Sequence, residues 1–167
     1  IDGKYNMTLI KGANNFMIDE WNQTKIKPMY TLYPESVRNG TGLIGIVCDE
    51  NNLYMLYDFT SCKTKLNIQN GVSITVGASH HNRPITQGQN GIYFASDLGK
   101  SPNSLEDHLI FEVSIPISLI TKNKNLPIGM CAFMSEWIST KEKIALSYPY
   151  DTDSRVPKKW ADLNLMN

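Results

Sequence analysis

The chain has 167 residues, which suits one domain around a single hydrophobic core, so we expect residues 1–167 to form one domain. Charged residues make up only 19% of it, and sixteen basic residues balance sixteen acidic ones. This disfavours nucleic acid and anionic membranes as partners, because both are bound through clustered Lys and Arg. No stretch approaches the roughly 20 apolar residues that span a bilayer. Because the sequence begins with Ile1, we expect a processed protein or a fragment.

The hydrophobic pattern predicts β-strands along most of the chain. Residues 41–48 read as a buried strand and residues 53–59 alternate cleanly, so the turn at 49–52 predicts a hairpin. Further strands are expected at residues 72–76, 92–95, 109–115, 128–138 and 144–148. Helical signals are weak, with a turn or two expected at 117–122 or in the tail. Residues 1–40 are weakly patterned, and we expect them to be peripheral or exchanged between chains.

Many short strands separated by Asn, Gly and Pro predict an all-β protein, namely a two-sheet antiparallel β-sandwich with immunoglobulin-like layering. Residues 128–138 are apolar on both faces, so this strand should be central. His108 falls on the polar phase of its strand and is expected to be exposed.

The tryptophans Trp21, Trp137 and Trp160 are the side chains most able to stack on the apolar face of a sugar. Each could equally be part of the core. The loop that carries His80, His81 and Arg83 offers further ligand contacts, and Arg83 would donate hydrogen bonds to hydroxyl or carboxylate groups. Adjacent histidines on an extended chain point to opposite sides, which disfavours a shared metal.

Catalysis finds little support, because no nucleophile elbow, zinc-protease motif or phosphate loop is present. We therefore expect a protein that is not an enzyme. Asp151 and Asp153 could offer oxygens to calcium, although the same pattern also suits a plain turn. Met55, Met130 and Met134 raise the alternative of an axial haem ligand, but methionine fills cores more often than it binds iron.

Three cysteines, Cys48, Cys62 and Cys131, allow at most one internal disulfide. Sequons at Asn6, Asn22 and Asn39 favour a glycosylated, extracellular or cell-surface setting, although sixteen asparagines also produce such triplets by chance.

Several segments together resemble the DOMON-like superfamily, which includes the family 9 carbohydrate-binding modules. Residues 17–21 are similar to its "ID…EW" opening, and residues 47–58 to its "D-x-x-x-LY" hairpin. Residues 70–74 occupy the place of its "D-x-V-E-I" strand, and residues 109–115 and 129–136 resemble its two late core strands. Residues 148–165 resemble its closing "P…P-x-x-W-x-x-L-x-L".

The resemblance implies a sandwich that binds sugar, haem or another small ligand. Family 9 modules clamp a sugar between two tryptophans and often carry calcium. This chain departs from them, because residues 70–95 hold no Trp and the usual acidic positions carry Ser73 and Thr75. A clamp would therefore need Trp137 or Trp160.

We accordingly expect a non-catalytic, extracellular carbohydrate-binding or cell-surface module whose partner is a carbohydrate or a neighbouring surface protein. One alternative is a structural surface-layer or filament subunit that self-assembles through sandwich edges. The other is a haem-binding electron carrier.

Overall fold

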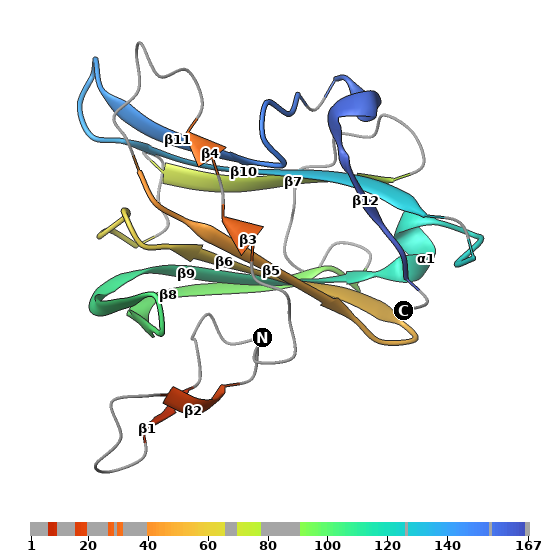
Figure 1. The fold of residues 1–167 in the computed structure, drawn as a ribbon, viewed down its shortest axis with the longest axis horizontal. Helices are drawn as coiled ribbons and strands as arrows, with labels where there is room; N and C mark the ends of the chain where they lie inside the picture. The colour runs from red at the N-terminus through yellow and green to blue at the C-terminus, as the bar shows by residue number, and fades with distance from the viewer. Residues whose placement is uncertain are drawn as a thin grey trace.

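The computed structural model describes residues 7–9, 16–19, 27–28, 30–31, 40–65, 70–77, 91–125, 127–153 and 155–165. Within these ranges most residues lie in strands. Two antiparallel sheets face each other as the two layers of a sandwich (Figure 1). The all-β, two-sheet antiparallel sandwich predicted from the sequence is confirmed.

One layer, here called the β6 sheet, has the strand order β3-β5-β6-β9-β8. Its strands are β3 (Lys27–Pro28), β5 (Leu43–Cys48), β6 (Asn52–Phe59), β9 (Ser104–Pro116) and β8 (Tyr93–Ser101). The predicted hairpin is the β5–β6 pair. Asp49 closes its turn, because one carboxylate oxygen accepts from the backbone N–H groups of Asn51 and Asn52. Strands β8 and β9 are longer than predicted, because their polar ends also pair across the hairpin.

The other layer, here called the β10 sheet, is built around one long strand. Its strands are β10 (Ile128–Trp137), β11 (Lys143–Tyr148), β12 (Ala161–Leu163), β4 (Tyr30–Thr31) and β7 (Asn70–Gly77). Strand β10 pairs with β7 on one edge and with β11 and β12 on the other. It is therefore central in its sheet, as its apolar character on both faces predicts. Strands β1 (Met7–Leu9) and β2 (Phe16–Asp19) form a separate ribbon, drawn below the β6 sheet in Figure 1.

The hydrophobic core fills the space between the sheets. Alternation along β6 and β9 directs every second side chain inward, and Tyr57, Phe59 and Phe111 are among the largest fully buried residues. Phe111 packs edge-on against Tyr57 with ring centroids 5.6 Å apart, and it stacks on Phe94 at 5.5 Å. Each aromatic pair contributes roughly 0.5–1.5 kcal/mol beyond the burial of its area.

The sulfur-containing side chains also belong mainly to this interior. Met55, Met130 and Met134 are at most 1% exposed and lie in the core cluster. Cys48, Cys62 and Cys131 are free thiols, so the single disulfide that the sequence left open is not formed.

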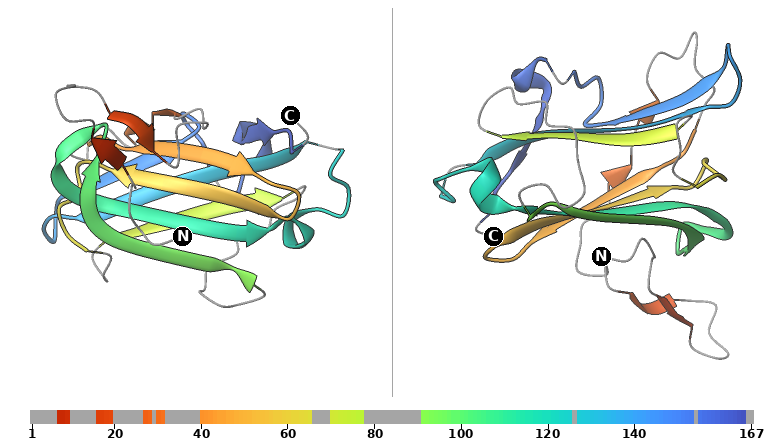
Figure 2. Two further views of the ribbon diagram at one scale, coloured as in Figure 1. Left: turned by 90° about the horizontal axis from the view of Figure 1, so that it is seen from below. Right: turned by 180° about the vertical axis from the view of Figure 1, so that it is seen from behind.

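Helical structure in the described ranges is short. Helix α1 (Ile117–Ile120) follows Pro116 at the end of β9, inside the range where a helical turn was predicted, and the 3₁₀ turn η2 (Pro157–Lys159) precedes β12. No helix in the described part of the chain is long and apolar enough to cross a membrane. The two views of Figure 2 show α1 at one end of the layers and the β10–β11 hairpin at the other.

Candidate functional site

Trp137 is an exposed aromatic ring at the end of β10. It keeps 48% of its surface exposed, although its strand is otherwise mostly buried. Lys143 is its register partner on β11, and the Lys143 Nζ atom lies 5.2 Å from the centroid of the ring. This cation–π contact holds the indole on one side. About half of the Trp137 surface remains exposed beside this contact.

The same face of β10 continues the site along the strand. Met134 and Ala132 point into the core, so alternation places Ser135 and Phe133 on the outer face together with Trp137. Both are half-buried rather than fully covered. Trp137 is four positions after Phe133, which is roughly 13 Å along a strand. The result is a strip with an aromatic ring at each end and a hydroxyl between them.

The end of β10 is fixed to the other sheet beside Trp137. The Thr64 hydroxyl, in the loop after β6, donates a hydrogen bond of 2.9 Å to Glu136 Oε1. Trp137 therefore stands on a strand end that is tied to both layers.

The second predicted platform, Trp160, is placed differently. It follows η2, is 8% exposed, and donates its indole N–H to the backbone oxygen of Asp153 over 3.0 Å. The sequence left open whether Trp160 is a stacking platform or a core residue, and the structure shows it buried. Trp21 lies outside the described residues. Of the two tryptophans described, Trp137 is the exposed one.

The predicted calcium ligands are engaged by cations of their own segment. Lys159 Nζ lies 2.7 Å from Asp151 Oδ2, and Arg155 contacts both carboxylate oxygens of Asp153 at 3.1 and 2.9 Å. Hydrogen bonds from Arg155 lower the pKa of Asp153 to about 2. No group of three His, Cys, Asp or Glu side chains gathers into a metal site in the described ranges. Calcium at Asp151 and Asp153 stays a prediction, and the metal would have to displace Lys159 and Arg155 from these carboxylates.

The remaining predicted site residues cannot be placed. His80, His81 and Arg83, and the sequon residues Asn6, Asn22 and Asn39, lie outside the described residues. Their roles in ligand contact and glycosylation stay predictions.

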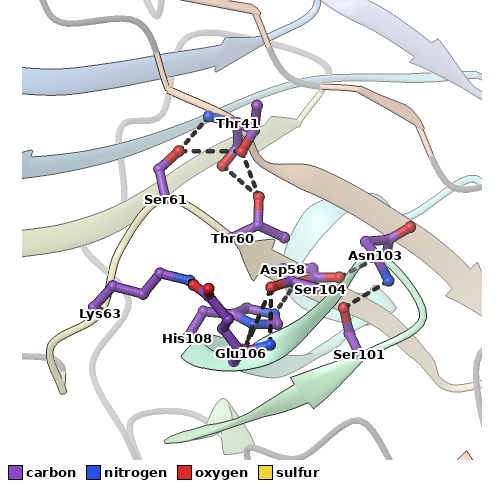
Figure 3. Close-up of polar contacts among 10 residues, drawn as sticks. All are labelled: Thr41, Asp58, Thr60, Ser61, Lys63, Ser101, Asn103, Ser104, Glu106 and His108. Carbon is purple, nitrogen blue, oxygen red and sulfur yellow. Dashed lines mark hydrogen bonds and ion pairs between the residues drawn. The ribbon is translucent and has the colours of Figure 1, made fainter.

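The expectation that His108 is exposed is wrong, because the side chain is 0% exposed. It lies at the start of β9 and forms part of a buried polar cluster with Asp58 of β6 (Figure 3). His108 Nε2 lies 2.5 Å from Asp58 Oδ1, and Nδ1 lies 2.7 Å from the backbone oxygen of Glu106. The amide of Asn103 donates to Asp58 Oδ2 over 2.7 Å. Alternation along β9 correctly placed His108 on the face of the β6 sheet that points away from the core, but this face is covered at His108.

The protonation of His108 follows from its partners. A backbone carbonyl only accepts, so Nδ1 carries a hydrogen, while Nε2 faces a carboxylate oxygen. Burial alone would lower the pKa of His108, but the hydrogen bonds to Asp58 and to the Glu106 carbonyl, with the charge of Asp58, raise it above its usual value. Lys63 acts in the opposite direction and is paired with Glu106 at 3.1 Å. Below the folded-state pKa of His108, its imidazolium and the Asp58 carboxylate form an ion pair inside the protein.

A set of hydroxyl groups closes the neighbouring strand ends, as Figure 3 shows. The Thr41 backbone N–H donates to Ser61 Oγ over 2.5 Å, and the Thr60 hydroxyl donates to the Thr41 backbone oxygen over 3.0 Å. These bonds join the start of β5 to the end of β6. We assign this cluster and the ion pair to stability rather than to ligand contact.

No protein-family model matches the sequence, and no curated protein matches it significantly. Solved structures that share its fold include two carbohydrate-binding modules. A family 9 carbohydrate-binding module from Caldicellulosiruptor kristjanssonii in complex with cellotriose aligns with 98% of this chain and 92% of its own, with a TM-score of 0.56 and 14% identity. A module of the same family and organism in complex with glucose aligns with 98% and 94%, with a TM-score of 0.53 and 15% identity. The predicted resemblance to family 9 carbohydrate-binding modules is confirmed for the fold.

Proposed function

We propose that this protein is a non-catalytic, extracellular carbohydrate-binding module, and that Trp137 is its stacking platform. The observation that carries the proposal is an indole that stays 48% exposed at the end of a long, largely buried strand. The fold is shared with modules whose structures hold cellotriose and glucose, which supports the same ligand class here. Fold alone does not fix function, so the argument rests on Trp137.

The contacts around Trp137 suit a sugar. A pyranose presents C–H groups that pack on the exposed part of an indole, while its hydroxyls need donors and acceptors at the edge. Lys143 and Ser135 supply such groups beside the ring. Phe133 offers a second aromatic surface further along the strand, so a chain of linked sugar rings fits this strip better than a single ring does. We propose His80, His81 and Arg83 as further hydrogen-bonding groups.

The size of the Trp137 contribution can be estimated from its exposed area. Covering roughly 60 Å² of apolar ring at about 25 cal/mol per Å² contributes about 1.5 kcal/mol, which is about tenfold in the dissociation constant. Titration of the chain with cellotriose and glucose in a calorimeter tests this. We expect Trp137→Ala to weaken cellotriose binding about tenfold and Trp137→Phe to retain part of it.

Tyr93→Ala is the matched control, because Tyr93 is a 58% exposed aromatic residue on β8 of the other sheet. It should leave cellotriose binding unchanged. Two results would refute the proposal. One is an equal loss of affinity in the Tyr93 and Trp137 variants. The other is that the unmodified chain has no measurable affinity for any member of a broad sugar panel.

A further inference from the structure

A cleft of about 430 Å³ opens between the two sheets at the end of the sandwich that carries α1. Strand β12 leaves the β10 sheet here and crosses toward the tip of the β5–β6 hairpin (Figure 1). The backbone oxygen of Leu165 accepts a weak hydrogen bond from the Cys48 thiol over 3.5 Å, which joins the two sides. The cleft is separate from Trp137, which stands at the opposite end of β10.

The floor of this cleft consists of side chains that belong to the core by their position. Ile46, Cys48, Tyr148, Leu163 and Leu165 all pack against the hydrophobic core and all line the cleft. They are nevertheless only half-buried, unlike the fully buried core residues beside them. Apolar surface left open between two layers, in a volume typical of small-molecule sites, fits a ligand with an apolar body.

A cation stands at the mouth of the same cleft. Lys27 of β3 pairs in register with Ile44 of β5, and Ile44 is 1% exposed in the core, so Lys27 lies on the inner face at the edge of the sheet. No carboxylate of the described residues forms an ion pair with Lys27. Asp162 also lines the cleft, but it is in register with Gly129, between the buried Ile128 and Met130, so alternation places its side chain on the outer face of β12. Among the described residues that line the cleft, Lys27 is therefore the charged residue on the inner face of the sheets.

We propose that this cleft binds a small amphipathic carboxylate, with its apolar body between β5 and β12 and its carboxylate at Lys27. The chain of a medium-length fatty acid has the required chemistry. This site shares no residue with the proposed sugar site, so either can fail without the other.

Cys48 provides a direct readout of occupancy. It is half-buried in the cleft, whereas Cys62 and Cys131 are 0% exposed and serve as internal controls. Burial and the neighbouring Asp49 raise the pKa of the Cys48 thiol, so alkylation with iodoacetamide is followed at alkaline pH by intact mass. We expect octanoate to slow alkylation of Cys48 about tenfold at ten times its dissociation constant, and 1-octanol to protect less at equal concentration. Calorimetric titration with octanoate measures binding independently of the thiol.

The charged contact is tested by Lys27→Gln, with Lys122→Gln as a control that removes an exposed lysine outside the cleft. We expect Lys27→Gln to abolish the preference for octanoate over 1-octanol and Lys122→Gln to keep it. Equal protection by both compounds in the unmodified chain would overturn the assignment of a carboxylate. Absence of octanoate binding in the calorimeter would overturn the site itself.

Discussion

The buried pair of His108 and Asp58 makes a quantitative prediction about stability. Both side chains are at most 1% exposed, so replacing His108 with Leu leaves the Asp58 carboxylate inside the protein, where it still accepts a hydrogen bond from the Asn103 amide. Removing one member of a buried ion pair costs about 3–5 kcal/mol. For a domain of this size, each kcal/mol shifts the thermal midpoint by about 2–4 °C, so we expect a loss of roughly 6–20 °C.

Urea denaturation of four chains separates this pair from simple loss of packing. They are the unmodified chain, His108→Leu, Asp58→Leu and the double variant. The double variant should lose clearly less than the sum of the single variants, because replacing both charges by apolar groups removes the unpaired charge. Lys63→Ala is the control: it breaks an ion pair whose side chains are 46% and 83% exposed, and such surface pairs contribute about 0–1 kcal/mol. Additive losses, or a loss below about 1 kcal/mol in His108→Leu, would refute the reasoning.

Three further predictions follow from the described contacts. The pKa of His108 is raised in the folded state, so its stabilising contribution is fully present below about pH 6.5, the unfolded pKa, and is lost as the pH rises through the folded pKa. Denaturation at several pH values should therefore show the free energy of unfolding falling over this range. His108→Leu should remove this pH dependence. A methyl group added at Gly42 would lie 2.7 Å from Met134 Cε and 2.8 Å from Leu146 Cδ1, so the ends of these two buried side chains must shift. Gly42→Ala should therefore cost about 1 kcal/mol in the same assay, and a gain in stability would contradict the reasoning. If calcium displaces Lys159 and Arg155 from Asp151 and Asp153, excess calcium should raise the thermal midpoint and EDTA should reverse the rise. Asp153→Asn should abolish the effect. A midpoint that is insensitive to calcium would exclude this site.

The strands could be predicted from the sequence because alternation is a local property. The β5–β6 hairpin has two apolar runs joined by a turn of Asp and Asn, and the structure forms it with Asp49 accepting in the turn. The pairing of β7 with β10 joins residues about sixty positions apart, from Asn70 opposite Glu136 to Gly77 opposite Gly129. Neither strand carries a local signal that selects the other, so sequence reasoning could place both strands without predicting their contact.

The candidate site was only partly predictable for a related reason. The residues around Trp137 and Trp160 do not show which indole is buried, because burial depends on which segment crosses the ring. Trp160 is held by a hydrogen bond to the Asp153 backbone, seven residues earlier, whereas Trp137 meets only Lys143 across the hairpin among the ring contacts of the described residues. The fold therefore decides that Trp160 is buried and Trp137 is exposed.

The burial of His108, which was predicted to be exposed, is in keeping with the low content of charged residues, 19% of the chain. The rule that polar phase means exposure holds when the outer face of a sheet meets water. In the β6 sheet, Leu56, Ile110 and Glu112 share that outer face with His108 and are all at most 2% exposed. The centre of the β6 sheet, around β6 and β9, is therefore buried on both faces, and a charge kept there must find a partner within the fold. Alternation indicates the face of the sheet on which His108 and Asp58 lie, but their burial and pairing depend on what covers that face, which alternation does not show.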